Sequence, residues 1–174
     1  MKQLIFFACS LLTTSLSLGQ TKTEQLKITI PEANKFKIGY QEEDSTHRYV
    51  EFIPVKEEIY DWTSQVILSS LKGVTAVSMT AAMNSTFDQA KKTALNPALM
   101  LVEQNNTTKH PWIIFKIEAS SFKDDPEPES QLYYLIQGAT ALFTNTVTIK
   151  ENNFTKEFTD KWVKVFKASK LVYQ

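Results

Sequence analysis

The chain has little of what catalytic and metal-binding proteins commonly use. Among 174 residues there is one cysteine, Cys9, and there are two histidines, His47 and His110. Cys9 lies in an apolar stretch near the N-terminus, so the rest of the chain offers no thiol nucleophile, disulfide or thiolate ligand. The 4 glycines are isolated from one another, which excludes a glycine-rich phosphate-binding loop. No G-x-S-x-G nucleophile motif is present.

The chain also lacks net charge. Its 19 lysines and arginines balance 19 aspartates and glutamates. A near-neutral protein has no strong positive field, so we expect neither nucleic acid nor an anionic membrane surface as a partner. Lys91 and Lys92 are interpreted as part of a solvated helix face.

The N-terminus has the form of a secretory signal peptide. Lys2 supplies the positive charge, residues 4–12 are apolar, and Ser17 and Gly19 place small residues where signal peptidase reads. The sequence therefore predicts a signal peptide over residues 1–19, the alternative being an uncleaved anchor, and a single domain over residues 20–174. We expect export to the periplasm or the cell exterior. No later apolar run is long enough to span a membrane.

Apolar and polar residues alternate in many short segments, as they do in half-buried strands. Helical spacing of apolar residues predicts two amphipathic helices, over residues 74–93 and after a Thr155 cap. The order of these strands and helices along the chain predicts an α+β domain with a mainly antiparallel sheet flanked by the two helices. We expect residues 20–25 to fray and the threonines of 141–149 to face solvent. Strands are predicted over residues 26–30, 36–40, 47–54, 65–68, 98–102, 112–119, 131–137 and 141–149.

The most distinctive stretch runs from Tyr49 to Leu68. It predicts a strand that ends at Pro54, an acidic turn, and a second strand that begins after Trp62. We expect Trp62 to be a buried residue of the core, because a tryptophan between two strands can bury a large apolar area.

Three segments carry a resemblance to a known group of proteins. They are FKIGYQ with YVEFIPVKEEIYDWTSQVIL, QLYYLIQGATALF, and KEFTDKWVKVFKAS. They resemble patterns in uncharacterised bacterial exported proteins, and the element order is similar to the Mog1/PsbP-like fold. The resemblance implies an antiparallel sheet flanked by helices and a role in protein binding or complex assembly. It assigns no functional residue.

Candidate chemical sites are few. His47 or His110 could act as a general base, although no nucleophile is placed beside either, and surface positions near strand ends are the simpler interpretation. The two histidines could bind a metal with Glu51 or Asp124, but no metal-binding motif supports this. The acidic residues 124–129 could offer oxygens to calcium, but they lack the required spacing and fit a solvated loop better.

Aromatic residues could instead line a pocket for a sugar or a lipid, although at strand and helix spacing they are more often core residues. The six candidates are Trp62, Trp112, Tyr133, Tyr134, Phe158 and Trp162.

The leading hypothesis is a non-enzymatic exported domain that acts by contact with another envelope or extracellular protein. The alternatives are a small-ligand or lipid-binding module with an aromatic cavity between sheet and helix and, less strongly supported, a hydrolase. No catalytic residue, metal ligand or cofactor is assigned.

Overall fold

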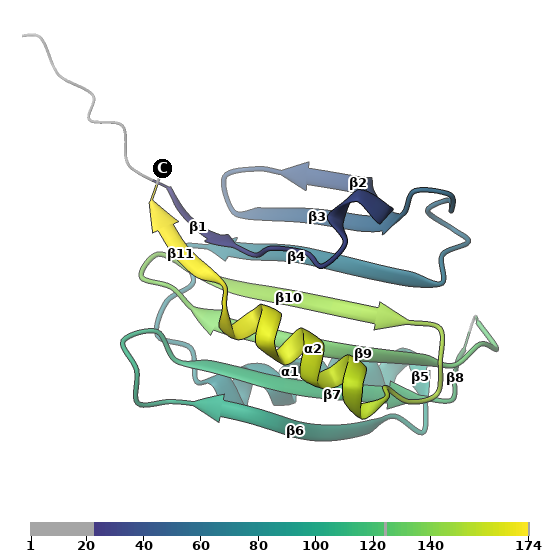
Figure 1. Ribbon diagram of the computed structural model, residues 1–174. Coiled ribbons are helices and arrows are strands. Elements are labelled where there is room, and N and C mark those ends of the chain that lie inside the picture. Colours follow the sequence, from purple (N-terminus) through teal and green to yellow (C-terminus); the bar gives the residue numbers. More distant parts are fainter. Residues whose placement is uncertain (1–22, 124, 174) are drawn as a thin grey trace, which may run out of the picture.

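The computed structural model describes residues 23–123 and 125–173 (Figure 1). The predicted signal peptide over residues 1–19 therefore lies outside the described residues. In the described part, neither helix is long and apolar enough to cross a bilayer.

A seven-stranded sheet forms the centre of the molecule, with the order β2-β3-β4-β10-β9-β7-β6. Every neighbouring pair of strands is antiparallel, which confirms the predicted sheet type. The strands are β2 (Phe36–Glu43), β3 (His47–Pro54), β4 (Ser64–Lys72), β6 (Ala98–Asn105), β7 (Trp112–Ala119), β9 (Glu129–Gln137) and β10 (Ala141–Ile149).

Two helices cover opposite faces of this sheet (Figure 1). Helix α1 (Met79–Thr93) contacts β7 and β9 on one face. Helix α2 (Lys156–Lys167) lies on the other face. The Thr155 side chain accepts a hydrogen bond from the Phe158 N–H at 3.1 Å, which confirms the predicted N-cap of α2. The α+β class with two flanking helices is thus confirmed.

The core has one cluster on each face. Beneath α2, Trp162 and Phe166 pack on apolar side chains of the central strands. Beneath α1, Met79, Met83 and Phe87 pack on Phe115 and its neighbours. These helix residues follow the predicted apolar spacing.

The N-terminal segment covers the part of the α2 face that α2 leaves open. Strand β1 (Glu24–Lys27) pairs with β11 (Lys170–Tyr173), and the following chain, with Ile28 and Ile30, packs on the α2-side core before the short helix η1 (Ala33–Lys35). The prediction that residues up to 25 fray is wrong for Glu24 and Gln25, because β11 supplies a pairing partner. A further short pair joins β5 (Ala94–Leu95) to β8 (Ser121–Phe122).

Two local predictions are also corrected. The first helix begins at Met79 rather than at residue 74, because Ser78 adopts an extended N-cap conformation and Ala76 has a positive φ of 57°. Thr146 and Thr148 are buried rather than solvent-facing. β10 is an interior strand, and Thr146 is flanked by Ile67 and Tyr133.

Trp62 is not a core residue. It is half-buried, it lies in neither apolar cluster, and the Lys150 ammonium lies 4.8 Å from its ring centroid. The core position expected for it is wrong, because Trp62 lies in the loop between β3 and β4, where its ring contacts the Lys150 ammonium instead of the core. The most buried apolar side chains of this stretch are Val66 and Ile53, with 0% and 1% exposure.

Candidate functional site

Within the described residues, half of one sheet face has no helix over it. Helix α1 lies behind the β9 and β7 side of the sheet, and among the described residues no helix lies behind β2, β3 and β4 (Figure 1). This open half-face exposes two large apolar side chains: Tyr40 is 47% exposed and Leu71 is 49% exposed. A sheet face with large uncovered side chains is a surface on which another molecule can bury area.

Four side chains form an alternating square on the open half-face, which we call the Tyr–Glu cluster: Tyr40, Glu42, Tyr49 and Glu51. In the strand register Tyr40 lies opposite Glu51, and Glu42 lies opposite Tyr49. The Tyr40 hydroxyl donates to Glu42 Oε2 at 2.6 Å, and the Tyr49 hydroxyl donates to Glu51 Oε2 at 3.2 Å. The two tyrosine rings are tilted, with centroids 6.0 Å apart. The cluster is therefore held in place by its own contacts.

Burial and hydrogen bonds set the charge of the cluster. Burial, followed by the charge of Glu51, raises the pKa of Tyr49. The hydrogen bond to Glu42 raises the pKa of Tyr40 and, together with a second bond from His47, lowers the pKa of Glu42. The tyrosines thus remain neutral and Glu42 remains ionised near neutral pH. The exposed Tyr40 ring beside the exposed Glu42 carboxylate is suited to a lysine or arginine side chain.

A buried glutamine supports the deeper side of the cluster. Gln65 on β4 donates from Nε2 to Glu51 Oε1 at 2.5 Å, and Gln65 and Glu51 are each 8% exposed. Glu51 therefore receives one hydrogen bond on each carboxylate oxygen. This arrangement fixes the orientation of a carboxyl group that would otherwise be costly to bury.

His47 lies beside this cluster, at the start of β3. Its Nε2 is 3.0 Å from Glu42 Oε1, and its Nδ1 is 3.0 Å from Asp44 Oδ2. The Glu42 contact is the largest cause of a raised His47 pKa, which burial partly opposes and Asp44 reinforces. The hydroxyl of Thr46 is 3.5 Å from Nδ1 and donates to Asp44. Both ring nitrogens thus face carboxylates, an arrangement that favours the imidazolium over a free base.

The predicted grouping of histidines with Glu51 or Asp124 does not form. His110 precedes β7, and its Nδ1 donates to the backbone carbonyl of Gln137 at 3.0 Å. The strands β4, β10 and β9 lie between β7 and the strand β3 that carries His47. Asp124 lies outside the described residues. Across residues 23–123 and 125–173, no group of three His, Cys, Asp or Glu side chains is arranged to hold a metal ion.

Asp125 of the acidic loop and Glu129, the first residue of β9, direct their carboxylates toward one lysine. Asp125 forms an ion pair with Lys150, and Glu129 Oε2 lies 3.7 Å from the same ammonium. Burial raises the pKa of Glu129, and the hydrogen bond from Lys150 lowers that of Asp125. These two groups neutralise one cation, as expected of a solvated structural loop.

The six aromatic candidates do not share a pocket. Trp162 and Phe158 line a cavity of about 240 Å³ between α2 and the sheet. Tyr134 stacks on Phe166 in the core under α2, next to Trp112, whereas Tyr133 stacks on Phe115 on the opposite face. Trp62 lies over Lys150. Only one part of the predicted aromatic lining is therefore present.

Sequence reasoning missed the Tyr–Glu cluster. The signal was present as Tyr-x-Glu in both β2 and β3, from Tyr40 to Glu42 and from Tyr49 to Glu51. Alternation places each pair on one face of its strand. The β-bulge between Ile38 and Tyr40 decides which face β2 presents, and a bulge cannot be read from the spacing alone.

No protein-family model and no curated protein matches the chain. Solved structures similar to it include the Saccharomyces cerevisiae Ran-binding protein Mog1p and a mutant of Mog1. Mog1p is 11% identical with a TM-score of 0.48, and the alignment covers 82% of this chain and 82% of Mog1p. The Mog1 mutant is 11% identical with a TM-score of 0.48, over 82% of this chain and 83% of the mutant. This likeness concerns the arrangement of strands and helices, and neither family nor binding partner transfers with it.

Proposed function

We propose that the protein is a non-enzymatic binding domain that contacts another protein through the open half-face, with the Tyr–Glu cluster at the centre of the contact. The observation that carries the proposal is the combination of exposed Tyr40 and Leu71 with hydrogen-bonded carboxyl groups on a half-face that no helix of the described residues covers. Aromatic side chains that are already oriented lose little conformational freedom on binding, and tyrosine is enriched at protein interfaces.

The chemistry of the cluster indicates the partner's chemistry. Tyr40 and Glu42 are the exposed members of the cluster, so a lysine or arginine of the partner can contact the Tyr40 ring face and the Glu42 carboxylate together. Ile67 and Leu71 on β4 offer apolar area beside the Tyr–Glu cluster. We therefore propose a partner surface with a basic side chain set among apolar groups.

The proposal includes export and an envelope or extracellular protein as the partner, with the Mog1/PsbP-like group as the structural relative. The secretory form of residues 1–19 supports the compartment. In that compartment the domain would act by binding its partner in a complex rather than by catalysing a reaction.

The test is affinity purification of the full chain from the envelope fraction of its source cell, with quantitative comparison of three forms. The cluster variant carries Tyr40→Ala and Glu42→Gln. The control carries Tyr60→Ala and Glu58→Gln, because Tyr60 is 98% exposed and lies in the loop between β3 and β4, outside the cluster. We expect at least one protein to be recovered about tenfold less with the cluster variant, as for loss of an interface anchor.

Recovery of that protein should also fall when salt is raised, since the contact includes exposed charges. The control should retain it. Equal recovery of every bound protein by the wild type and the cluster variant would contradict the proposal, provided that the two forms melt at the same temperature.

A further inference from the structure

A second site lies on the opposite face of the sheet, independent of the open half-face. A cavity of about 240 Å³ opens between α2, the turn before η1 and the adjoining ends of β3 and β4. Its apolar lining includes Phe36, Val147, Phe158 and Trp162. Val147 and Trp162 are 2% and 4% exposed, so the floor is part of the rigid core rather than a mobile loop.

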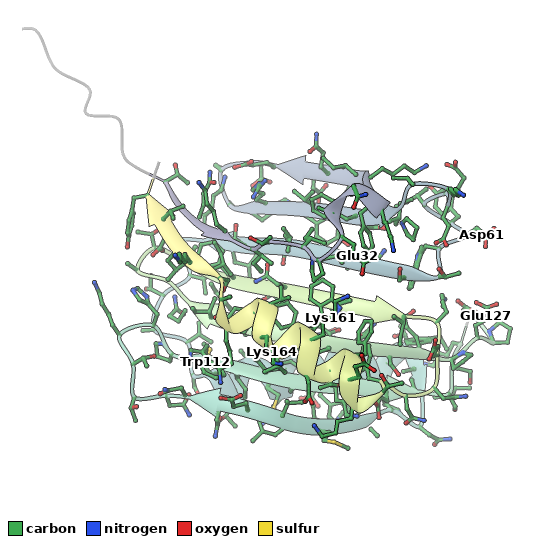
Figure 2. All side chains as sticks on the ribbon, viewed as in Figure 1. Glu32, Asp61, Trp112, Glu127, Lys161 and Lys164 are labelled. Carbon is green, nitrogen blue, oxygen red and sulfur yellow. The ribbon has the colours of Figure 1, made fainter. Side chains whose placement is uncertain are left out.

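The mouth of the cavity is charged. Glu32, Lys35 and Lys161 line it, and both lysines contact the Glu32 carboxylate, Lys161 at 3.2 Å. Figure 2 shows Glu32 and Lys161 facing each other across the space between the N-terminal segment and α2. Two cations therefore share one anion, and the mouth carries a net positive charge.

The backbone of Glu32 is held in an uncommon conformation. Its φ of 53° and ψ of 41° lie in the left-handed region, which residues other than glycine and asparagine seldom adopt. Such outliers cluster at ligand clamps and switch regions, where the surrounding structure maintains them. Here the conformation places a carboxylate between two ammonium groups, directly above an apolar cavity.

We propose that this cavity binds a small amphipathic carboxylate, whose ring-sized apolar body enters among Phe36, Phe158 and Trp162 and whose carboxylate binds Lys161 and Lys35 in competition with Glu32. The hydrogen bonds that Lys35 and Lys161 give to Glu32 already keep its pKa low, so the lysines form a site that stabilises a carboxylate. The ligand's carboxylate accepts the same hydrogen bonds from the two lysines. Burial of the ligand's apolar ring adds to the binding free energy.

The volume limits the size of the ligand. An apolar cavity of about 150 Å³ is enough to bind benzene. A cavity of about 240 Å³ therefore has room for an aromatic ring with a short side chain, and a long acyl chain exceeds it. Binding would add to the aromatic contacts that Trp162 already makes with Phe158.

The test uses 3-phenylpropionate as the probe, with 3-phenylpropionamide as its uncharged match and hexadecanoate as the long-chain comparison. Titration of the full chain is followed by Trp and Phe NMR signals and by calorimetry. We expect saturable binding of the carboxylate, with perturbed signals from Trp162 and Phe158. The amide should bind about tenfold more weakly, as for loss of one charge-assisted contact.

Three variants separate the roles of the lining. Lys161→Met should weaken binding about tenfold, and Glu32→Gln should strengthen it, because the competing carboxylate is removed. Ser64→Ile places a larger side chain in the cavity lining and should abolish binding. Lys164→Met is the matched control, because Lys164 lies about one turn from Lys161 on α2 and does not line the cavity. The affinity of this variant for 3-phenylpropionate should change less than about twofold.

Several results would overturn the proposal. These are equal binding of acid and amide, weaker binding by Glu32→Gln, unchanged binding by Ser64→Ile, or absence of any saturable signal from Trp162 with the wild type. Stronger binding of hexadecanoate than of the ring-sized acid would assign the site to lipid chains instead and contradict the size argument. The melting temperature of each variant, measured in parallel, shows whether it is folded.

Discussion

Gly138 leaves the space that the Glu24 carboxylate occupies. A β-carbon at Gly138 would lie 2.4 Å from Glu24 Oε2. Glu24 reaches this turn from β1 and accepts hydrogen bonds from the backbone N–H groups of Ala139 and Thr140, at 3.0 and 2.8 Å. The hydroxyl of Tyr173 also donates to Glu24 at 3.0 Å. A carboxylate that is 5% exposed thus ties the N-terminal and C-terminal strands to the β9–β10 turn.

Gly138→Ala should lower the free energy of unfolding by about 2 kcal/mol, because the added methyl group overlaps Glu24 and the Phe143 ring. The effect should be smaller by about 1 kcal/mol when Glu24 is already alanine, since part of the overlap is gone. Chemical denaturation of the double-mutant cycle measures this coupling. Gly73→Ala is the control for the coupling, because no described atom beyond its chain neighbours lies within 4 Å of its β-carbon position, and its φ of +77° makes any loss a backbone effect; equal coupling to Glu24 from Gly73 would contradict the explanation.

Glu24 should make the stability depend on pH. Burial is the largest influence and raises the pKa of Glu24, but the hydrogen bonds from Thr140, Ala139 and Tyr173 together hold it below the usual value. A carboxyl group with a lowered folded-state pKa stabilises the protein above its unfolded pKa of about 4.3, and this contribution is lost as pH falls through the folded value.

Urea unfolding of the wild type and Glu24→Gln, each at neutral pH and at about pH 3, tests this. The two proteins should differ most at neutral pH and converge in acid. A difference that stays constant across this range would show that Glu24 acts by shape alone.

The two tryptophans Trp162 and Trp62 should differ in their effect on stability. Trp162→Ala removes a 4% exposed ring that contacts Phe158 and Phe166, and should cost about 3–5 kcal/mol. Trp62→Ala removes a half-buried ring over Lys150 and should cost about 1–2 kcal/mol. Denaturant titrations of both variants give the comparison. Equal losses would place Trp62 in the core after all.

Asn145 is a buried polar residue of β10. It is 2% exposed, and its Nδ2 has no hydrogen-bond partner among the described residues. Because an unpaired buried polar group costs about 1–3 kcal/mol, Asn145→Leu should raise the free energy of unfolding by about 1 kcal/mol. Asn145→Asp is the matched control and should destabilise the fold, because it puts a charge in the same site. A destabilising Asn145→Leu would indicate that the amide has a partner in solution.

The sequence predicted most of the regular structure, because local spacing carries that information. The apolar period of the final segment, with Thr155 before it, predicted α2 and its buried Trp162. Alternation predicted the strands that form the sheet, and their antiparallel pairing followed from the order of elements. The sequence predicted less of the candidate site. It pointed to His47 and Glu51 as candidates but not to Tyr40 and Glu42 beside them.

Long-range pairing decided the rest. β11 was not predicted, and Glu24 was expected to fray, since neither short segment has a partner until the two ends of the chain meet. Burial of Thr146 depends on its neighbours in β4 and β9 rather than on its own strand.

The sequence by itself determined the α+β class, the helix faces and the lack of cysteine chemistry outside the N-terminal segment, since spacing and composition express local geometry and reactivity directly. Only the tertiary structure decided where side chains distant in sequence meet. It placed Tyr40 opposite Glu51 through a bulge, and it brought Glu32 to Lys161 above an apolar cavity. It also moved Trp62 from the expected core to a position over Lys150. The physical reason is that a strand's alternation defines two faces, but the partners on each face come from strand register and helix docking.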